Sequence, residues 1–136
     1  MKRTKLLVAA MALPMAMTAM TASAAPVEID YWSVFTGGDG ATMQSMVDTF
    51  NESQDEVHVN HTPMTADDLY QKIPLAVQTG TEVPDVAVVH IERIPNFVEN
   101  EMLWSYDEDI LAEAGISAGD YIESAYNASN IDDEQY

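Results

Sequence analysis

The sequence predicts an α/β fold built on an open, mostly parallel β-sheet flanked by helices. Strand-like and helix-like segments alternate along the chain, which is the pattern of parallel strands joined by helical crossovers. Residues 86–89 form a continuous apolar run between turn residues, as in a strand that is buried on both faces. The chain has no cysteine, so we expect an ordinary hydrophobic core without disulfides.

The first 24 residues are predicted to be a secretory signal peptide. Basic residues open the chain, residues 6–13 are apolar, and residues 22–24 are small, as a signal peptidase requires. A membrane anchor is the alternative, which the short apolar run and Pro14 disfavour. Because no cysteine is present to carry a lipid, we expect a soluble periplasmic protein that is not inserted in the membrane. Residues 25–136 are then its folded part.

The expected mature chain is strongly acidic. All 23 acidic residues follow residue 24, where Lys72 and Arg93 are the two basic residues. Residues 25–136 therefore carry a net charge of about −21, against −18 for the whole chain. Such a surface repels nucleic acid and anionic lipid, so neither is an expected partner. The acidity either attracts a cationic solute or serves solubility, and the even spread of acidic residues favours solubility.

The first three elements follow from local sequence. Residues 27–35 are rich in β-branched and aromatic residues and predict a strand. A glycine-rich turn at 37–40 separates it from a predicted helix at 41–52, where apolar residues recur at helical period. A polar turn follows, and residues 57–60 alternate as in a short strand.

The second helix has a clear start and a clear end in the sequence. Thr65 and Asp68 resemble a capping box, and Gly80 is a favourable residue for ending a helix near Thr79. Pro74 lies inside this segment, where we expect it to kink the helix or delay its start.

The remaining elements are a buried strand followed by helices. The strand is the apolar run at 86–89, and apolar residues at helical spacing predict a helix over 94–102. Asp107 is expected to cap a short helix that ends at Gly115, and Ser117 is expected to cap another that runs through Tyr126. The polar, acidic segment 127–136 is not expected to complete a core.

In a parallel sheet, ligands bind beyond the carboxyl ends of the strands. This rule selects residues 32–40, 61–64 and 90–93, which should share one edge of the sheet. In the first segment, Asp39 either caps the next helix or accepts hydrogen bonds from sugar hydroxyls, and Gly38 belongs to a weak anion-binding pattern. Trp32 and Phe35 supply aromatic faces for a sugar ring, with core packing as the alternative. Alternation places Trp32 on the opposite side from Tyr31.

The third segment contributes His90, Glu92 and Arg93. Glu92 and Arg93 either hold polar groups of a ligand or form an ion pair of little consequence. His90 is either a ligand contact or a hydrogen-bonded structural residue. The three histidines show no metal-binding spacing, and no nucleophile–base motif is present. The sequence therefore predicts no metal, no cofactor and no catalytic residue.

Three stretches carry a resemblance to a known family. They are IDYWSVFTGGDGATMQSMVDTFNESQDEVHVN, DDLYQKIPLAVQTGTEVPDVAVVH and FVENEMLWSYDED. In their order and spacing they resemble the opening of extracellular solute-binding proteins of the sugar (maltose) type. The resemblance implies a periplasmic-binding-protein-like N-terminal lobe of type II, which delivers a sugar, polyol or oligosaccharide to an ABC permease without catalysis. The matching contacts with sugar would be Asp39 and the pair Glu92–Arg93, whereas an aromatic residue at 88–89 is missing.

The resemblance also implies that residues 25–136 are part of a longer, two-lobed receptor. We therefore expect an incomplete N-terminal lobe that forms one wall of a ligand cleft. Three rival readings stay open. The first is a receptor of the same fold for a polyamine or glycerol phosphate. The second is a lobe of a secreted carbohydrate-active enzyme, with Glu92 and Asp39 as acid and base. The third is a purely structural interaction module.

Overall fold

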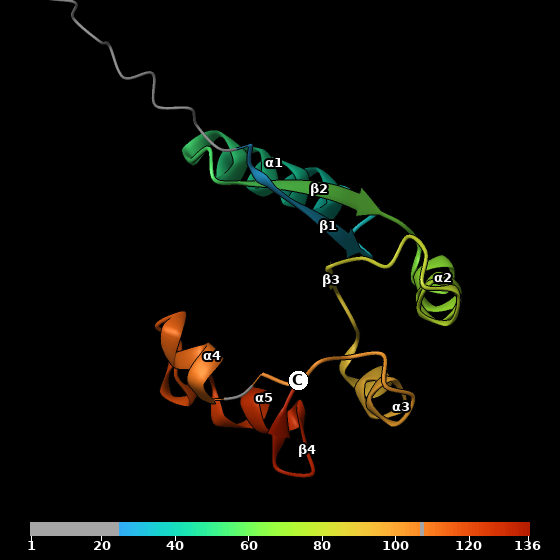
Figure 1. Ribbon diagram of the computed structural model, residues 1–136, viewed down its shortest axis with the longest axis vertical. Helices are drawn as coiled ribbons and strands as arrows, with labels where there is room; N and C mark the ends of the chain where they lie inside the picture. The colour runs from blue at the N-terminus through green and yellow to red at the C-terminus, as the bar shows by residue number, and fades with distance from the viewer. Residues whose placement is uncertain (1–24, 107) are drawn as a thin grey trace, which may run out of the picture.

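The computed structural model describes residues 25–106 and 108–136. The predicted signal peptide and the predicted cap at Asp107 lie outside the described residues. The first half of the chain alternates strands and helices as predicted (Figure 1). Its elements are β1 (Val27–Ser33), α1 (Gly38–Ser53), β2 (Val57–Pro63), α2 (Ala66–Thr79), β3 (Val86–Ala87), the 3₁₀ helix η1 (Ile91–Arg93) and α3 (Ile94–Glu99). The second half contains α4 (Glu108–Glu113), the 3₁₀ helix η2 (Ala118–Asp120), α5 (Glu123–Ala128), β4 (Asn130–Ile131) and β5 (Glu134–Gln135).

The main sheet is parallel and has the strand order β2-β1-β3. β1 and β2 pair over their full length, from Val27 opposite Val57 to Ser33 opposite Pro63. β3 joins the other side of β1, with Tyr31 opposite Val86. The three strands therefore end at the same edge of the sheet, as predicted.

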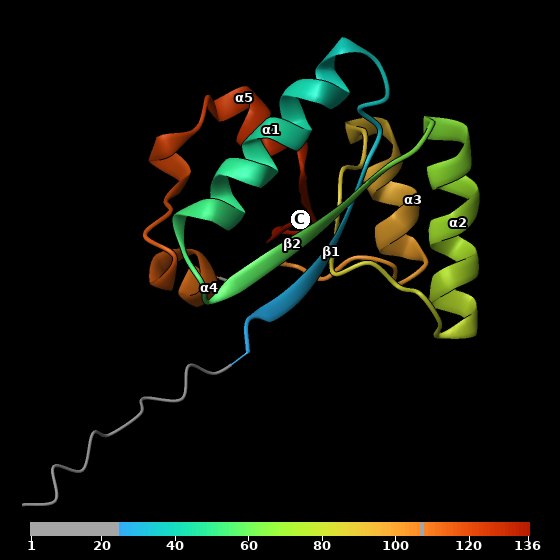
Figure 2. The same cartoon turned by 90° about the horizontal axis from the view of Figure 1, so that it is seen from above.

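Helices lie on both faces of this sheet. α1 lies on one side, whereas α2 and α3 lie on the other (Figure 2). Side chains of β1 alternate accordingly: the hydroxyl of Tyr31 lies 3.8 Å from Sδ of Met43 on α1, and Trp32 packs against Leu69 and its neighbours on α2. The predicted opposition of Tyr31 and Trp32 is confirmed, and so is the predicted α/β class.

The hydrophobic core lies between the sheet and the pair α2–α3. Its buried members are Trp32, Leu69, Ile73, Ala76 and Phe97. The α1 side is packed less tightly, because Val47 is the one buried residue of that helix. The two faces of the sheet are therefore unequally covered.

α2 begins and ends as its sequence predicts. The hydroxyl of Thr65 accepts a hydrogen bond of 3.2 Å from the backbone N–H of Asp68, and Gly80 takes the left-handed conformation at φ 65°. The delayed start that Pro74 was expected to cause is not observed, because α2 runs from Ala66 through Pro74 to Thr79. Capping and packing of Leu69 and Ile73 on the sheet hold the helix on both sides of the proline.

Two strands differ in length from the prediction. β2 continues past Asn60 to Pro63 because it stays paired with β1 over seven residues. β3 is only two residues long, although the backbone N–H of Val88 still donates to the carbonyl of Trp32 at 2.9 Å. The expectation that β3 is buried on both faces is wrong, since Val86 is 47% exposed. Among the described residues, β3 is an outer strand of the sheet, and no strand pairs with it on the side away from β1.

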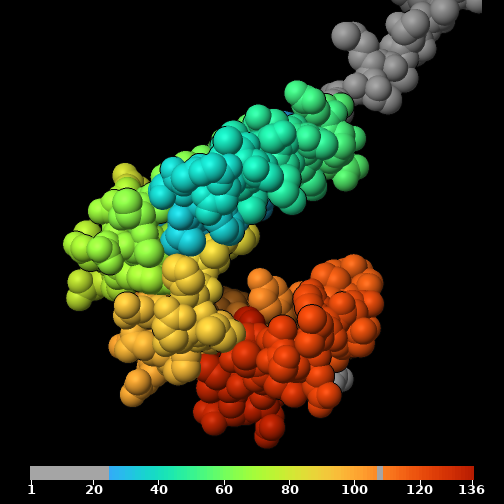
Figure 3. Space-filling model, turned by 180° about the vertical axis from the view of Figure 1, so that it is seen from behind, coloured from blue at the N-terminus to red at the C-terminus, as the bar shows by residue number. Residues whose placement is uncertain are grey.

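The C-terminal segment also contains elements that the sequence did not predict. The single helix expected from Ser117 to Tyr126 is divided into η2 and α5, with Ser117 and Asp120 forming a capping box. The polar end of the chain forms a small antiparallel hairpin of β4 and β5. This segment lies apart from α1 across a hollow in the surface (Figure 3).

Candidate functional site

The candidate site lies where the three parallel strands end. The backbone N–H of Met64 donates to the carbonyl of Ser33 at 2.9 Å, which joins the end of β2 to the end of β1. The N–H of Val88 joins the third segment to Trp32 in the same way. The loops leading into α1 and α2 therefore meet at one end of the sheet (Figure 2).

The loop between β1 and α1 is organised by Asp39. Its Oδ1 atom accepts hydrogen bonds from the backbone N–H groups of Gly37, at 3.0 Å, and Gly40, at 2.9 Å. Gly40 must be glycine, because a Cβ atom there would lie 2.4 Å from the carbonyl oxygen of Phe35. The loop is therefore a tight turn with a fixed shape, and Gly38 is the first residue of α1.

This geometry affects what the loop can bind. The carboxylate of Asp39 occupies N–H groups that an anion cradle would offer, and its charge opposes a phosphate. Its second oxygen, Oδ2, accepts no hydrogen bond from any residue that the structure describes. An exposed carboxylate oxygen of this kind is suited to accept from hydroxyl or ammonium groups.

A second polar cluster joins β1, β2 and α1. The hydroxyl of Ser33 lies 2.7 Å from Nε2 of His61, and Nδ1 of His61 lies 2.9 Å from Oε1 of Gln44. Tyr31 stacks on the His61 ring at 5.1 Å between centroids. Burial lowers the pKa of His61 and raises the pKa of Tyr31, so both are neutral at pH 7. Ser33 is fully buried, and this cluster therefore fixes the strand ends and does not offer a nucleophile.

The third part of the edge is built around Tyr70 of α2. The Tyr70 hydroxyl accepts a hydrogen bond of 2.9 Å from the backbone N–H of His90 and also contacts Nδ1 of the His90 ring. The guanidinium of Arg93 lies 4.8 Å from the centre of the Tyr70 ring, which is within the range of a cation–π interaction. Phe97 also contacts the Tyr70 ring, in an edge-to-face arrangement. Tyr70 thus holds His90 and Arg93 at the end of β3.

The remaining predicted residues lie in different surroundings. Glu92 is exposed and forms no ion pair with Arg93 in the described part of the chain, so the predicted alternative of a neighbouring pair is not observed. Phe35 is half-buried. Trp32 is only 8% exposed and packs in the core, with Nζ of Lys72 5.3 Å from its ring centre. Its position matches core packing, which was the alternative to a sugar-stacking role.

Sequence reasoning selected His90 and Arg93 but missed the residue that joins them. Tyr70 lies in the first turns of the helix that follows β2, and the strand-end rule applied to that helix would have included it. His61 was placed beyond its strand, whereas it lies within β2. No hydrogen bond or ring contact links the Asp39 loop directly to the His90–Arg93 turn in the described residues.

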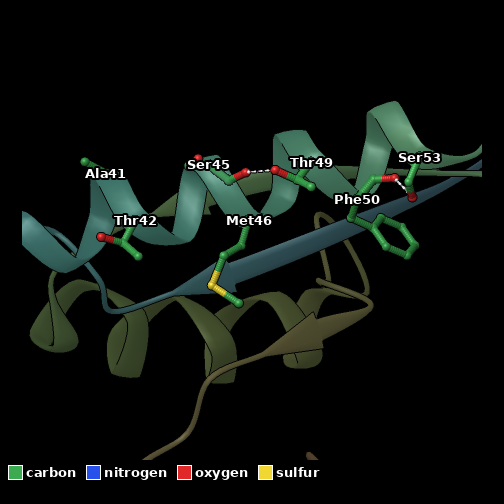
Figure 4. Close-up of a pocket in the computed structure, with 7 residues that line it drawn as sticks. All are labelled: Ala41, Thr42, Ser45, Met46, Thr49, Phe50 and Ser53. Carbon is green, nitrogen blue, oxygen red and sulfur yellow. Dashed lines mark hydrogen bonds between the residues drawn. The ribbon is translucent and has the colours of Figure 1, made fainter.

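Other surface features do not form a competing site. A groove of about 650 Å³ runs along one side of α1, where Ser45, Met46 and Thr49 are among the residues that line it (Figure 4). The hydroxyls of Thr49 and Ser53 there donate to carbonyls of their own helix at 2.7 Å, so these two protons are not available to a ligand. Within residues 25–106 and 108–136, no cluster of three or more metal-binding side chains occurs. The described helices also include none with the length and apolar character needed to cross a membrane.

Solved structures show which known fold this arrangement matches. The galacto-N-biose/lacto-N-biose I-binding protein of an ABC transporter from Bifidobacterium longum matches with a TM-score of 0.70 and 23% identity, over 85% of this chain and 29% of that chain. A cyclic α-maltosyl-1,6-maltose binding protein from Arthrobacter globiformis matches with a TM-score of 0.68 and 24% identity, over 81% of this chain and 27% of that chain. An ABC substrate-binding protein from Listeria monocytogenes in complex with cycloalternan matches with a TM-score of 0.69 and 22% identity, over 82% of this chain and 28% of that chain.

The chain has the fold of these solute-binding proteins. It spans less than a third of their length. No family model matches the sequence, and no curated protein matches it. The likeness therefore concerns the arrangement of strands and helices, and the periplasmic-binding-protein-like fold that the sequence predicted is confirmed.

Proposed function

We propose that this protein binds a sugar or a related polyol or oligosaccharide and presents it to an ABC permease. The fold neighbours are described as binding acarbose, cyclic maltosyl-maltose, cycloalternan, lacto-N-biose and mannotriose. All five are binding proteins, which supports a receptor without catalysis over a lobe of a secreted enzyme. Residues 1–24 would export the chain to the periplasm, where such receptors meet their permease.

One observation carries this proposal. The carboxylate of Asp39 and the Tyr70–His90–Arg93 cluster both lie at the edge where the parallel strands end. Carboxylate oxygens accept hydrogen bonds from sugar hydroxyls, and a guanidinium group donates hydrogen bonds to the hydroxyl oxygens. Aromatic rings pack against the C–H face of a sugar. This edge therefore combines the three kinds of contact that a neutral, hydroxyl-rich ligand needs.

The proposed contacts lie in the loop and first turn of α1, on α2, and in the turn after β3. They are Phe35, Gly38, Asp39, Tyr70, His90, Glu92 and Arg93. Trp32 is left out because its ring is buried in the core. Gly38 lies in the first turn of α1 and has open space beside it, since a Cβ atom placed on this residue would have no neighbouring atom within 4 Å. A ligand could therefore approach its backbone.

The described chain would form one wall of the binding site. It matches under a third of each neighbour's length, and high affinity for small ligands requires enclosure on several sides. We therefore expect weak binding by this chain alone. A receptor of the same fold for a polyamine or glycerol phosphate would bind its solute at the same edge of the sheet, but through different side chains.

NMR titration of the ¹⁵N-labelled chain tests the proposal at low affinity. Maltose, lacto-N-biose and mannotriose would be added in turn, with putrescine and glycerol phosphate as rival ligands. We expect at least one sugar to shift the backbone signals of Gly38, Asp39 and Arg93, while Thr49 and Ser53 toward the C-terminal end of α1 stay unchanged. No shift with any sugar, or a response to putrescine alone, would contradict a sugar receptor.

The variant Asp39→Asn sharpens this test. The Asn side chain keeps an oxygen that can accept from Gly37 and Gly40, so the loop should persist while the negative charge is lost. We expect weaker sugar shifts with an unchanged melting temperature. Equal shifts in both proteins would remove Asp39 from the binding site.

A further inference from the structure

Tyr70 holds His90 through two contacts of different kinds. The backbone N–H of His90 donates to the Tyr70 hydroxyl at 2.9 Å, and the same hydroxyl contacts Nδ1 of the His90 ring. A backbone N–H can only donate, so the phenol oxygen is the acceptor in the first contact. Its own proton is then the group left for the second contact.

The direction of the second contact follows from this proton. Among the described residues, the Tyr70 hydroxyl has no acceptor other than Nδ1 of His90. If Nδ1 carried a proton, the phenol oxygen would accept twice and its own proton would have no partner there. If Nδ1 is unprotonated, both contacts are satisfied. The arrangement therefore favours the form of neutral His90 in which Nε2 carries the proton.

Nε2 of His90 is open for a ligand. His90 is exposed, and in the part of the chain that the structure describes its Nε2 atom forms no hydrogen bond. The two ring nitrogens point in divergent directions, so an Nδ1 atom turned toward Tyr70 leaves the Nε2–H directed away from it. Arg93 lies over the face of the same tyrosine. The end of β3 thus offers hydrogen-bond donors from both His90 and Arg93.

His61 shows the opposite arrangement of its ring proton. The amide nitrogen of Gln44 donates to the carboxylate of Asp48 at 2.8 Å, which leaves Oε1 of Gln44 to face Nδ1 of His61 at 2.9 Å. An amide oxygen can only accept, so Nδ1 of His61 carries the proton and Nε2 accepts from Ser33 at 2.7 Å. The third histidine, His58, is exposed, and its ring has no hydrogen bond with any described residue. It provides a free ring for comparison.

We propose that Tyr70 fixes the ring proton of His90 on Nε2, and that this Nε2–H donates to the ligand at the end of β3. His90 is then the residue that contacts the ligand, and the hydroxyl of Tyr70 acts through it as a positioning group. The ligand contact rests on the proposed function, because it adds a donor to the same site. The position of the proton rests only on contacts within the described chain.

The placement of donors and acceptors defines the class of ligand. The carboxylate of Asp39 only accepts hydrogen bonds, whereas the guanidinium of Arg93 and the Nε2–H of His90 only donate them. A sugar hydroxyl can do both, so one neutral ligand can satisfy all three groups. A protonated amine only donates and would leave His90 and Arg93 without acceptors. A phosphate only accepts, and its charge is repelled by Asp39. The site therefore selects uncharged sugars and polyols.

NMR of the ring nitrogens in the ¹⁵N-labelled 136-residue chain tests the proton positions without a ligand. Protonated and unprotonated ring nitrogens differ widely in ¹⁵N chemical shift, and the 3 histidines of the chain can be assigned with His→Gln variants. At about pH 8.5, where an imidazole ring is neutral, we expect the proton on Nε2 in His90, on Nδ1 in His61 and on both in exchange in His58. A proton on Nδ1 of His90, or the same mixture as in His58, would overturn the proposal.

The variant Tyr70→Phe tests the role of the hydroxyl. It removes the oxygen that contacts His90 and keeps the ring that Arg93 and Phe97 contact, so unchanged backbone signals of Phe97 would show that the packing persists. We expect the ring-nitrogen signals of His90 to move toward the mixture seen in His58. Equal His90 signals in the variant and in the unchanged chain would show that Tyr70 does not set the proton.

The variant Tyr31→Phe is the matched control. It makes the same chemical change at a tyrosine whose hydroxyl lies 3.8 Å from Sδ of Met43 and bonds to no described histidine. We expect the His90 signals and the affinity for sugar to stay as they are in the unchanged chain. An effect on His90 equal to that of Tyr70→Phe would mean that loss of any tyrosine hydroxyl disturbs the site, which contradicts the proposal.

Titration with maltose, lacto-N-biose and mannotriose tests the donor itself. We expect a sugar that binds to shift the Nε2 signal of His90, and Tyr70→Phe to bind this sugar about fivefold more weakly. Putrescine offers only donors and should leave Nε2 unchanged. A sugar that shifts Gly38 and Asp39 but not Nε2 of His90 would contradict the donor role. If no sugar shifts any signal, the proposed function and the ligand contact of His90 are both wrong, while the spectra without ligand still decide whether Tyr70 sets the proton.

Discussion

The hydroxyl of Ser33 lies 2.7 Å from Nε2 of His61 and joins the end of β1 to β2. Because the side-chain amide oxygen Oε1 of Gln44 accepts a hydrogen bond from the Nδ1–H of His61, Nε2 is the acceptor and the serine hydroxyl donates to it. A second proton on His61 would reverse this bond and leave the hydroxyl of a fully buried serine in need of another acceptor. The arrangement favours neutral His61.

This arrangement predicts a stability that falls in mild acid. Burial lowers the pKa of His61 below its ordinary value of 6.5, so the unfolded chain binds the proton first as the pH falls. The contribution of neutral His61 is complete above pH 6.5 and decreases as the pH drops toward the folded-state pKa. Urea unfolding at a series of pH values should show His61→Gln with a weaker pH dependence than the unchanged chain. His58→Gln, on the same strand but exposed, should retain it, and equal pH dependence in all three proteins would contradict the role of His61.

Gly40 should be far more sensitive to substitution than Gly38. A Cβ atom at residue 40 meets the carbonyl oxygen of Phe35 at 2.4 Å, whereas one at residue 38 meets nothing within 4 Å. We expect Gly40→Ala to lower the free energy of unfolding by about 1–3 kcal/mol. Gly38→Ala should be neutral or slightly stabilising, since alanine favours the helix. Chemical denaturation measures both, and similar losses would show that the turn is not tight.

The two basic residues of the described chain provide a matched test of the proposed sugar site. Arg93 lies over Tyr70 at the strand-end edge, and Lys72 lies over Trp32 beside the core. Loss of a charged hydrogen-bond donor should weaken sugar binding about tenfold or more in Arg93→Ala. Lys72→Ala should bind as the unchanged chain does. NMR titration with the responding sugar measures both, and an equal effect of the two variants would indicate a general charge effect.

Asn51 and Gln54 should protect the outer edge of β2 from pairing with another strand. The double variant Asn51→Ala, Gln54→Ala removes the four hydrogen bonds by which these side chains occupy backbone groups of Val59 and Val57. We expect light scattering to show more association than in the unchanged chain, because an open strand edge invites pairing. Asn60→Ala on β2 is the control, since the Asn60 side chain binds the carboxylate of Glu28 and not the backbone. A double variant that behaves like the control would show that these carboxamides do not guard the edge.

Local sequence signals predicted the elements that local interactions determine. Thr65 and Gly80 mark the ends of α2 because the cap and the left-handed turn each involve neighbours along the chain. The order of strands and helices, and the common edge at which strands end, followed from alternation and from the rules of parallel sheets. These rules identified Asp39, His90 and Arg93 as residues of one edge.

Features that depend on distant partners were missed. The contact of Tyr70 with His90 spans 20 residues and depends on how α2 is rotated against the sheet, which periodicity does not determine. The length of β3 depends on the strands beside it, and an apolar run alone does not indicate whether a neighbour is present on each side. Trp32 illustrates the same difficulty, because an aromatic residue near a strand end can face either the ligand or the core.

The side chains at the end of α1 determine on which side the main sheet can be extended. Asn51 and Gln54 occupy the outward backbone groups of Val59 and Val57, so the β2 side of the ladder is closed to a further strand. Any additional strand, whatever its origin, has to enter beside β3. Two carboxamides thereby give the sheet a direction of growth.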